Sequence, residues 1–237
     1  YRELNSLFIA EGDKLVQEAI DSGFEIVMVL CTEKSQISYH RAEIVSEATM
    51  EKATSLNSPS PSLAVIRIPA QTDANEIESI IRSKPLCLAL DGVRDPGNLG
   101  TILRIADWFG IDCIFASPDT VDLYNPKTVQ STMGAIFRKK VIYTPLQPIM
   151  QSFAQAGMPV YGTLLDGDNI YRQSLRSEGL IVMGSESEGI RKDNRHLVTD
   201  KLYIPSYPAD SETSESLNVA IATAVICAEF RRPASIE

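Results

Sequence analysis

Three loops of this 237-residue chain gather glycines and polar side chains of types that can do chemistry. They span residues 91–100, 184–189 and 206–218. Each loop follows a short apolar segment that predicts a strand. Because ligands of parallel α/β sheets bind beyond the carboxyl ends of the strands, we expect the three loops to converge on one crevice.

Phosphate binding is one candidate chemistry, since the loop at residues 91–100 is rich in glycine and precedes a predicted helix. Its glycines do not form G-x-G-x-x-G, and Asn98 stands where a P-loop has lysine. In the second loop, Gly184 and Gly189 have P-loop spacing, but Ile190 follows them in place of lysine. The two loops therefore give little support to dinucleotide binding or to nucleoside triphosphate hydrolysis.

Acid–base pairs, triads and metal sites have weak support too. Glu186 and Glu188 share one loop, so we expect them to point in different directions, with one capping the helix after Gly189. Neither His40 nor His196 lies beside a glycine-flanked serine, which argues against a Ser-His-Asp triad. The four cysteines are scattered without a C-x-x-C pair, so the sequence predicts packed, reduced thiols and no metal site.

The last predicted helix, residues 216–230, is apolar on every side along most of its length. A helix of this kind is buried, often between layers or between subunits. Its start carries Ser214, Ser216 and Asn218. One serine is explained as an N-cap, but the amide of Asn218 needs partners if it is buried, so a further role is expected there.

Bulk charge does not indicate a nucleic-acid partner, because the formal net charge is −9. Residues 1–84 carry 8 basic and 13 acidic residues, and residues 85–237 carry 14 and 18. Contacts with a phosphate backbone must therefore be local. The candidates are two basic clusters, at Arg138-Lys139-Lys140 and at Arg191, Lys192 and Arg195.

The composition is that of a globular protein, with 44% hydrophobic and 22% charged residues. No apolar stretch approaches the ~20 residues that cross a bilayer, and the start lacks the basic and apolar regions of a signal peptide. With the scattered cysteines, these features predict a cytoplasmic protein. The chain begins with Tyr1 rather than methionine, so the natural chain is expected to start earlier.

Strands and helices alternate along the chain, which predicts an α/β fold. In the first part, strands are expected at 7–10, 26–30 and 63–68, and helices at 14–20, 41–53 and 74–82. Pro85 breaks the helix before it and a strand follows at once. The sequence therefore predicts a small first domain over residues 1–84.

The second part, residues 85–237, repeats the alternation more strongly. Strands are expected at 86–90, 113–116, 159–162, 180–183 and 202–204, and helices near 99–109, 127–133, 149–156 and 216–230. Strands that are continuously apolar belong in a parallel sheet covered on both faces. This part therefore predicts a doubly wound α/β domain.

Three segments, taken together, resemble the motifs of one family. They are residues 98–110, with Asn98, Arg104 and a closing Phe-Gly; residues 182–189, Val-Met-Gly-Ser-Glu-Ser-Glu-Gly; and residues 204–222, from Ile-Pro into the last helix. In order and spacing they resemble the SpoU family of RNA ribose 2′-O-methyltransferases, within the SPOUT superfamily of trefoil-knot methyltransferases. Residues 7–16 are similar to the opening of that family's N-terminal domain, which implies an RNA substrate-binding domain at residues 1–84.

The resemblance implies a cofactor and an assembly. The second domain is expected to contain a C-terminal trefoil knot, an exception to unknotted chains, which binds S-adenosylmethionine and through which the protein forms a homodimer. The residues implied to hold the cofactor through main-chain groups are Thr163, Leu164, Gly184, Ile204 and Leu217. The resemblance implies no metal.

The implied reaction transfers a methyl group from the sulfonium of S-adenosylmethionine to a ribose 2′-hydroxyl in RNA, with ribosomal RNA favoured over transfer RNA. The implied catalytic residues are Asn98, Arg104, Glu186, Ser216 and Asn218. Because arginine stays protonated in proteins, we expect Arg104 to bind the neighbouring phosphate and stabilise the forming alkoxide rather than to act as a base.

Three alternatives stay open. An active enzyme of this family can instead modify transfer RNA. The acidic balance favours a module that kept the fold and RNA binding but lost catalysis, whereas the intact Asn98, Arg104, Glu186 and Asn218 oppose it. The third alternative is a different α/β enzyme that uses the same crevice for a small molecule.

Overall fold

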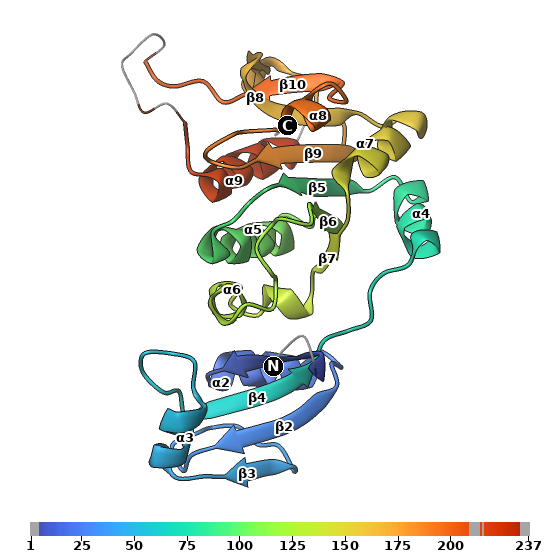
Figure 1. The fold of residues 1–237 in the computed structure, drawn as a ribbon. Coiled ribbons are helices and arrows are strands. Elements are labelled where there is room, and N and C mark those ends of the chain that lie inside the picture. Colours follow the sequence, from blue (N-terminus) through green and yellow to red (C-terminus); the bar gives the residue numbers. More distant parts are fainter. Residues whose placement is uncertain (1–4, 209–213, 215, 233–237) are drawn as a thin grey trace, which may run out of the picture. The chain divides into compact units, whose positions relative to one another are not determined.

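The computed structural model describes residues 5–208, 214 and 216–232 (Figure 1). By contacts between residues, the chain forms two compact units. Unit 1 comprises residues 1–70 and 122–138, and unit 2 comprises residues 71–121 and 139–237. This division differs from a single boundary after residue 84, because each unit takes up a segment from the other side of that point.

Unit 1 contains a four-stranded sheet in the order β1-β4-β2-β3. Its strands are β1 (Leu7–Glu11), β2 (Ile26–Cys31), β3 (Ala42–Ile44) and β4 (Ser62–Arg67). Its helices are α2 (Asp13–Asp21), α3 (Glu47–Ala53) and α6 (Pro126–Ser131), with the 3₁₀ turn η1 (Ala135–Phe137). β1 and β2 pair with β4 in antiparallel fashion, whereas β3 runs parallel to β2.

Aromatic contacts hold residues 122–138 in unit 1. The ring centroid of Phe8 on β1 lies 4.8 Å from that of Tyr124, and the centroids of Phe24 and Phe137 lie 5.3 Å apart. Aromatic side chains bury large areas and so dominate the energy of a small core. The helix predicted near residues 127–133 therefore forms, as α6, but it packs with unit 1 instead of the parallel sheet.

The prediction of helical structure around residues 41–53 is wrong at its start. Residues Ala42–Ile44 form β3 and pair with Val29–Cys31 of β2. The helix begins only after Ser46, whose Oγ accepts a hydrogen bond from the N–H of Thr49 (3.2 Å). An N-cap serine thus separates two segments that the apolar pattern alone had joined.

Unit 2 contains a six-stranded, fully parallel sheet in the order β10-β8-β9-β5-β6-β7. Its strands are β5 (Leu86–Asp91), β6 (Cys113–Ala116), β7 (Lys140–Tyr143), β8 (Val160–Asn169), β9 (Gly179–Gly184) and β10 (Asp200–Tyr203). Its helices are α4 (Ala74–Arg82), α5 (Pro96–Trp108), α7 (Leu146–Gln155), α8 (Lys192–Arg195) and α9 (Val219–Phe230), with the 3₁₀ turn η2 (Ile170–Arg172).

Helices cover both faces of this sheet, with α5 and α9 on one side and α4 and α7 on the other (Figure 1). On the second side, Ile81 of α4 and Phe153 of α7 pack with Cys87 and Ala89 of β5. Every residue of β5 is buried, as expected for the centre of a parallel sheet. The doubly wound α/β fold predicted for this part of the chain is confirmed.

Two predictions about single elements need correction. The sequence did not predict the edge strand β7. Only Ile142 of its four residues is buried and the strand begins with a lysine, so it lacks the continuous apolar pattern of the central strands. The last helix is not buried on every side, because Ile221 of α9 is 53% exposed. The four cysteines, in contrast, are free and buried, as predicted for packed thiols.

Phe153 tests the core beneath α7. It is fully buried and meets Phe115 of β6 edge to face, with ring centroids 6.2 Å apart. We expect Phe153→Ala to lower the free energy of unfolding by about 3–5 kcal/mol, because the cavity does not refill. Urea denaturation followed by circular dichroism measures the loss. Leu165→Ala is the control, since Leu165 is 71% exposed, and an equal loss in both variants would contradict this core.

Candidate functional site

Three of the predicted catalytic side chains meet in unit 2. Asn98 Nδ2 donates a hydrogen bond to Glu186 Oε1, and Asn218 Nδ2 donates to Asn98 Oδ1 (3.0 Å). The three residues come from α5, from the turn after β9 and from the residue before α9, one from each of the three predicted motifs. We call these three residues the amide cluster. Its existence confirms that the three loops converge.

Local signals in the sequence place Asn98 in the first turn of α5. Asp95 is the N-cap, and its Oδ1 accepts a hydrogen bond from the N–H of Asn98 (2.8 Å). Pro96 follows at the first helical position, where its fixed φ suits a helix start and its missing N–H costs nothing. The helix therefore starts at a defined residue, which fixes where the amide of Asn98 projects.

Helices α5 and α9 run in the same direction, because side chains join them at both ends. Asn218, the N-cap of α9, contacts Asn98 at the start of α5. At the far ends, Nε and Nη2 of Arg231 donate to the carbonyls of Phe109 (2.8 Å) and Gly110 (2.7 Å). Two helix N-termini therefore lie together at the amide cluster, and their partial positive charges favour an anion there.

Backbone hydrogen bonds close the turn that carries Glu186. The N–H of Gly189 donates to the carbonyl of Ser185 (2.9 Å), and the N–H of Ser185 donates back (3.3 Å). A Cβ on Gly184 would lie 2.1 Å from the carbonyl carbon of Gly189. Glycine at 184 is therefore required by the close approach of the same loop. The predicted cap by a glutamate is wrong, because Arg191 is the N-cap of α8 and no side chain caps that helix.

Arg104 and Ser216 do not join the amide cluster. Both are exposed, and neither forms a hydrogen bond or ion pair with any residue that the structure describes. Arg104 lies on α5 and Ser216 lies just before α9, so each is on a chain segment that carries a cluster residue.

The predicted cofactor residues lie on or after neighbouring parallel strands. Thr163 and Leu164 are on β8, Gly184 ends β9, and Ile204 follows β10, while Leu217 precedes α9 and is 46% exposed. The hydroxyl of Thr163 donates to the carbonyl of Val182 on β9 (3.0 Å). Residues 209–213 and 215, between β10 and α9, lie outside the described residues. A hollow of about 300 Å³ beside β10 includes none of these five residues.

Most cations of the two predicted basic clusters have carboxylate partners. Arg138 pairs with Glu18, Lys139 with Asp107 (4.0 Å), Lys140 with Glu76, Arg191 with Asp91, and Arg195 with Asp166 (2.7 Å). These five cations stay candidates for RNA contact, but a phosphate has to compete there with the carboxylates that the fold brings beside them.

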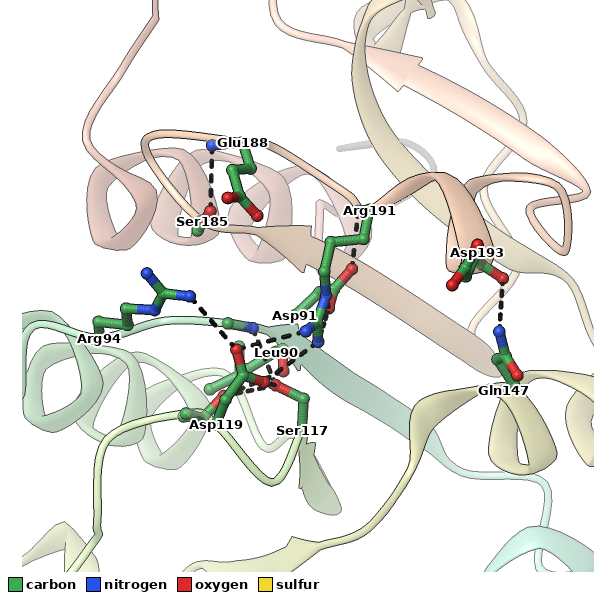
Figure 2. A network of polar contacts seen from close by, with 12 residues as sticks. Leu90, Asp91, Arg94, Ser117, Asp119, Gln147, Ser185, Glu188, Arg191 and Asp193 are labelled. Carbon is green, nitrogen blue, oxygen red and sulfur yellow. Dashed lines mark hydrogen bonds and ion pairs between the residues drawn. The ribbon is translucent and has the colours of Figure 1, made fainter.

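An ionic network that the sequence did not predict joins Asp91, Asp119 and Arg191 (Figure 2). Asp91, the last residue of β5, accepts hydrogen bonds from the N–H (2.9 Å) and Nε (2.6 Å) of Arg191. Arg191 also pairs with Asp119 (3.2 Å), which lies 3.7 Å from Arg94. The only local signal in the sequence for this network is Asp91 itself, a charged residue at the end of an otherwise apolar strand. The contact between Asp91 and Arg191 spans 100 positions, so spacing could not reveal it.

The network shifts the pKa of two of its members. Burial of Asp119 acts to raise its pKa, but the hydrogen bond from Ser117 and the charge of Arg191 outweigh it, so the pKa lies below its usual value. The hydrogen bond to Asp91 raises the pKa of Arg191, against a smaller opposing effect of burial. Among the described residues, no group of three or more His, Cys, Asp or Glu side chains could hold a metal ion, and no helix could span a membrane.

A parallel sheet whose loops meet beyond its carboxyl edge defines an α/β ligand-binding domain. Residues 85–228 match the SpoU rRNA Methylase family, so this chain belongs to that family. Residues 1–64 match a domain described as MRM3-like substrate binding domain. The family predicted from the three motifs is confirmed.

Named relatives of this chain are RNA methyltransferases. A Bacillus subtilis protein, 23S rRNA (guanosine(2553)-2′-O)-methyltransferase RlmP, is 29% identical over 97% of this chain and 90% of its own length. The Ralstonia nicotianae 23S rRNA (guanosine-2′-O-)-methyltransferase RlmB is 33% identical over 68% of this chain and 64% of its own.

Two solved structures share the fold over nearly the whole chain. A TrmH-family RNA methyltransferase structure from Porphyromonas gingivalis has a TM-score of 0.84 and 34% identity, and covers 98% of this chain and 92% of that one. The AdoMet-bound rRNA methyltransferase of Sinorhizobium meliloti has a TM-score of 0.83 and 28% identity, over 98% and 89% of the two chains.

Gly184→Ala tests the close backbone approach in the turn. We expect it to lower the free energy of unfolding by about 1–3 kcal/mol, because the new methyl group must push the backbone of Gly189 away. Urea denaturation measures the change. Ser187→Ala, in the same turn and exposed, is the control and should change stability by less than about 0.5 kcal/mol. A stable Gly184→Ala protein would rule out this packing.

Asp119→Asn tests the ionic network through pH. A carboxyl group with a lowered pKa in the folded state adds stability above its unfolded pKa, near 4, and loses it as pH falls through the folded pKa. We therefore expect the variant to be less stable than the parent at pH 7 and the difference to vanish in the acid range below about pH 4. Urea denaturation from pH 7 to pH 2.5 measures it. A difference that is constant with pH would contradict the ionic account.

Proposed function

We propose that this protein transfers a methyl group from S-adenosylmethionine to a ribose 2′-hydroxyl of ribosomal RNA. The observation that carries the proposal is the amide cluster, which joins all three family motifs through side-chain hydrogen bonds. Family membership supports the reaction class. Relatives named 23S rRNA 2′-O-methyltransferases support the substrate, and an AdoMet-bound relative supports the cofactor.

The residues proposed to hold S-adenosylmethionine fit such a ligand in their placement. Thr163, Gly184 and Ile204 lie on or after three adjacent parallel strands, where main-chain groups can bind polar atoms, and exposed Leu217 offers apolar surface. When bound, the cofactor supplies an electrophilic methyl group on a sulfonium. The chain's own residues must then bind and orient the ribose and accept a proton.

The amide cluster is suited to orient a hydroxyl group. Asn98 is held at both ends of its amide, by Glu186 and Asn218, so the cluster is ordered before a substrate arrives. Such positioning lowers the entropy cost of reaching attack geometry. Glu186 has a second carboxylate oxygen that Asn98 does not use, and this oxygen is the acceptor that the cluster offers for the hydroxyl proton.

Arg104 supplies a permanent positive charge on α5. It is exposed and unpaired among the described residues, so its guanidinium is available to a phosphate of the substrate. In this role it also stabilises negative charge that develops on the attacking oxygen. The exposed hydroxyl of Ser216, beside α9, is proposed as a further contact to the substrate.

The two helix N-termini at the amide cluster support RNA binding by a chain of net charge −9. Their field acts locally, where the attacked ribose and its phosphate would lie. Ribosomal RNA is preferred over transfer RNA because the named relatives act on 23S rRNA. The inactive RNA-binding module is disfavoured, because a lost activity would not require the hydrogen-bonded cluster to persist.

Four further features belong to the proposal. Residues 1–84 are proposed to present the RNA, supported by the substrate-binding match over residues 1–64. The C-terminal trefoil knot is supported by α9, which follows the edge strand β10 yet packs on α5.

A homodimer through unit 2 is supported by the exposed apolar side chains of Trp108 (85%) and Ile221. A cytoplasmic location is proposed as well, supported by a bacterial relative named for methylation of 23S rRNA.

Arg104→Ala tests the reaction directly. Transfer of tritium from methyl-labelled S-adenosylmethionine to ribosomal RNA is expected to fall about 10²–10³-fold in kcat, because charge on the forming alkoxide is no longer stabilised. Calorimetry should give unchanged affinity for the cofactor. Arg82→Ala, which removes an exposed arginine paired with Glu78 on α4, is the control. Full methylation by Arg104→Ala would remove Arg104 from the mechanism, and cofactor binding without any transfer by the parent protein would favour the inactive module.

A further inference from the structure

The pair formed by Asp91 and Arg191 lies outside the set of residues implied by the family motifs. The side chain of Asp91 has no exposed surface, although it is a carboxylate. It accepts from both the main chain and the guanidinium of Arg191, with Oδ2 bound to N–H and Oδ1 to Nε. A buried charge that is held in this way has its desolvation cost offset only by its partner.

We propose that Asp91 and Arg191 are positioning residues for methyl transfer, which hold the turn at 185–190 so that Glu186 reaches Asn98. The inference rests on the proposed function. Neither residue is assigned contact with the substrate or the cofactor.

The first support is the way the turn is anchored. At its start, Gly184 pairs in register with Asp91 across β9 and β5. At its end, Arg191 is bound by the same Asp91 through main-chain and side-chain hydrogen bonds. The hydrogen bonds between Ser185 and Gly189 close the base between these two points. One buried residue therefore fixes both ends of the segment that carries Glu186.

The second support is the link to the segment that carries Asn98. Arg191 Nη1 donates to Asp119 Oδ2 (3.3 Å), and Ser117 Oγ donates to Asp119 Oδ1 (2.8 Å). The same Ser117 hydroxyl accepts from the N–H of Gly92 (2.9 Å), in the loop between β5 and α5. The network thus reaches both chain segments whose relative position sets the contact between Asn98 and Glu186 (Figure 2).

The third support is that the guanidinium of Arg191 is already used. Its Nε contacts Asp91, its Nη1 contacts Asp119, and its Nη2 contacts both carboxylates. A phosphate that took over the donors bound to Asp91 would leave this buried carboxylate without its partner, which is strongly unfavourable. Arg94 is more exposed than Arg191, at 69% of its side chain, and its ion pair with Asp119 is longer (3.7 Å). These contacts therefore favour a role for Arg191 in positioning the turn at 185–190 rather than in binding RNA.

The test uses Arg191→Gln and Arg191→Lys in the full chain, with Arg176→Gln as the control. Arg176 pairs with Glu178 just before the start of β9, so this variant removes an ion pair away from the turn. Steady-state methylation of ribosomal RNA gives kcat and KM, and hydrogen exchange followed by mass spectrometry reports on residues 185–190. Urea denaturation shows that each variant is folded.

We expect Arg191→Gln to lower kcat about 10- to 100-fold, since displacement of a positioned group by about 1 Å can cost 10²-fold. The KM for RNA and its salt dependence should stay within about twofold, because no phosphate contact is lost. Arg191→Lys should recover part of kcat, since an ammonium can pair with Asp91 but cannot reproduce the fork of donors. Exchange in residues 185–190 should become faster in Arg191→Gln and stay unchanged in Arg176→Gln.

Several outcomes would overturn the inference. A folded Arg191→Gln protein with parental kcat, or with unchanged exchange in residues 185–190, shows that the pair does not position Glu186. A raised KM with a weaker salt dependence assigns Arg191 to RNA contact instead. If Arg191→Gln does not fold, Arg191→Lys decides on the same criteria. A parent protein that transfers no methyl group counts against the proposed function. In that case, hydrogen exchange in residues 185–190 still shows whether Asp91 and Arg191 hold the turn.

Discussion

The orientation of one amide, that of Asn98, is the constraint on which the site depends. Its nitrogen donates to Glu186 and its oxygen accepts from Asn218. A flipped amide would set its oxygen against a carboxylate and its NH₂ group against another NH₂ group, so only one orientation is favourable. That orientation requires α5 and α9 to start side by side. Arg231 enforces this arrangement from the opposite end of the two helices.

The same arrangement explains how an acidic chain can favour a polyanion at one place. Most of the basic residues in the two conspicuous clusters are neutralised by carboxylates of the same unit. At the site, the two helix starts meet the carboxylates of Asp95 and Glu186, and the exposed guanidinium of Arg104 has no ion-pair partner among the described residues. Local field and net charge are separate quantities, and recognition depends on the first.

The sequence predicted the elements of unit 2 well, because buried parallel strands leave continuous apolar segments, as in β5 and β9. It predicted the cluster residues through the family motifs. It did not predict β7, whose exposed edge weakens the apolar signal, nor the start of the helix after β3. The ion pair of Asp91 and Arg191 could not be predicted, since no local pattern joins residues 100 positions apart. The resemblance implied Gly184 as a cofactor residue, whereas the need for glycine at this position comes from the neighbouring backbone of Gly189.

The discontinuity of unit 1 has a consequence for how the protein can be divided. Its chain passes between the two units at residues 70, 121 and 138, and the rings of Tyr124 and Phe137 complete the packing around Phe8 and Phe24. A fragment cut after residue 84 would lack these rings and carry the apolar side chains of α4 without the core they pack against. The two units are thus distinct in their packing but not in the sequence, because each needs residues encoded within the other's span to complete its interior.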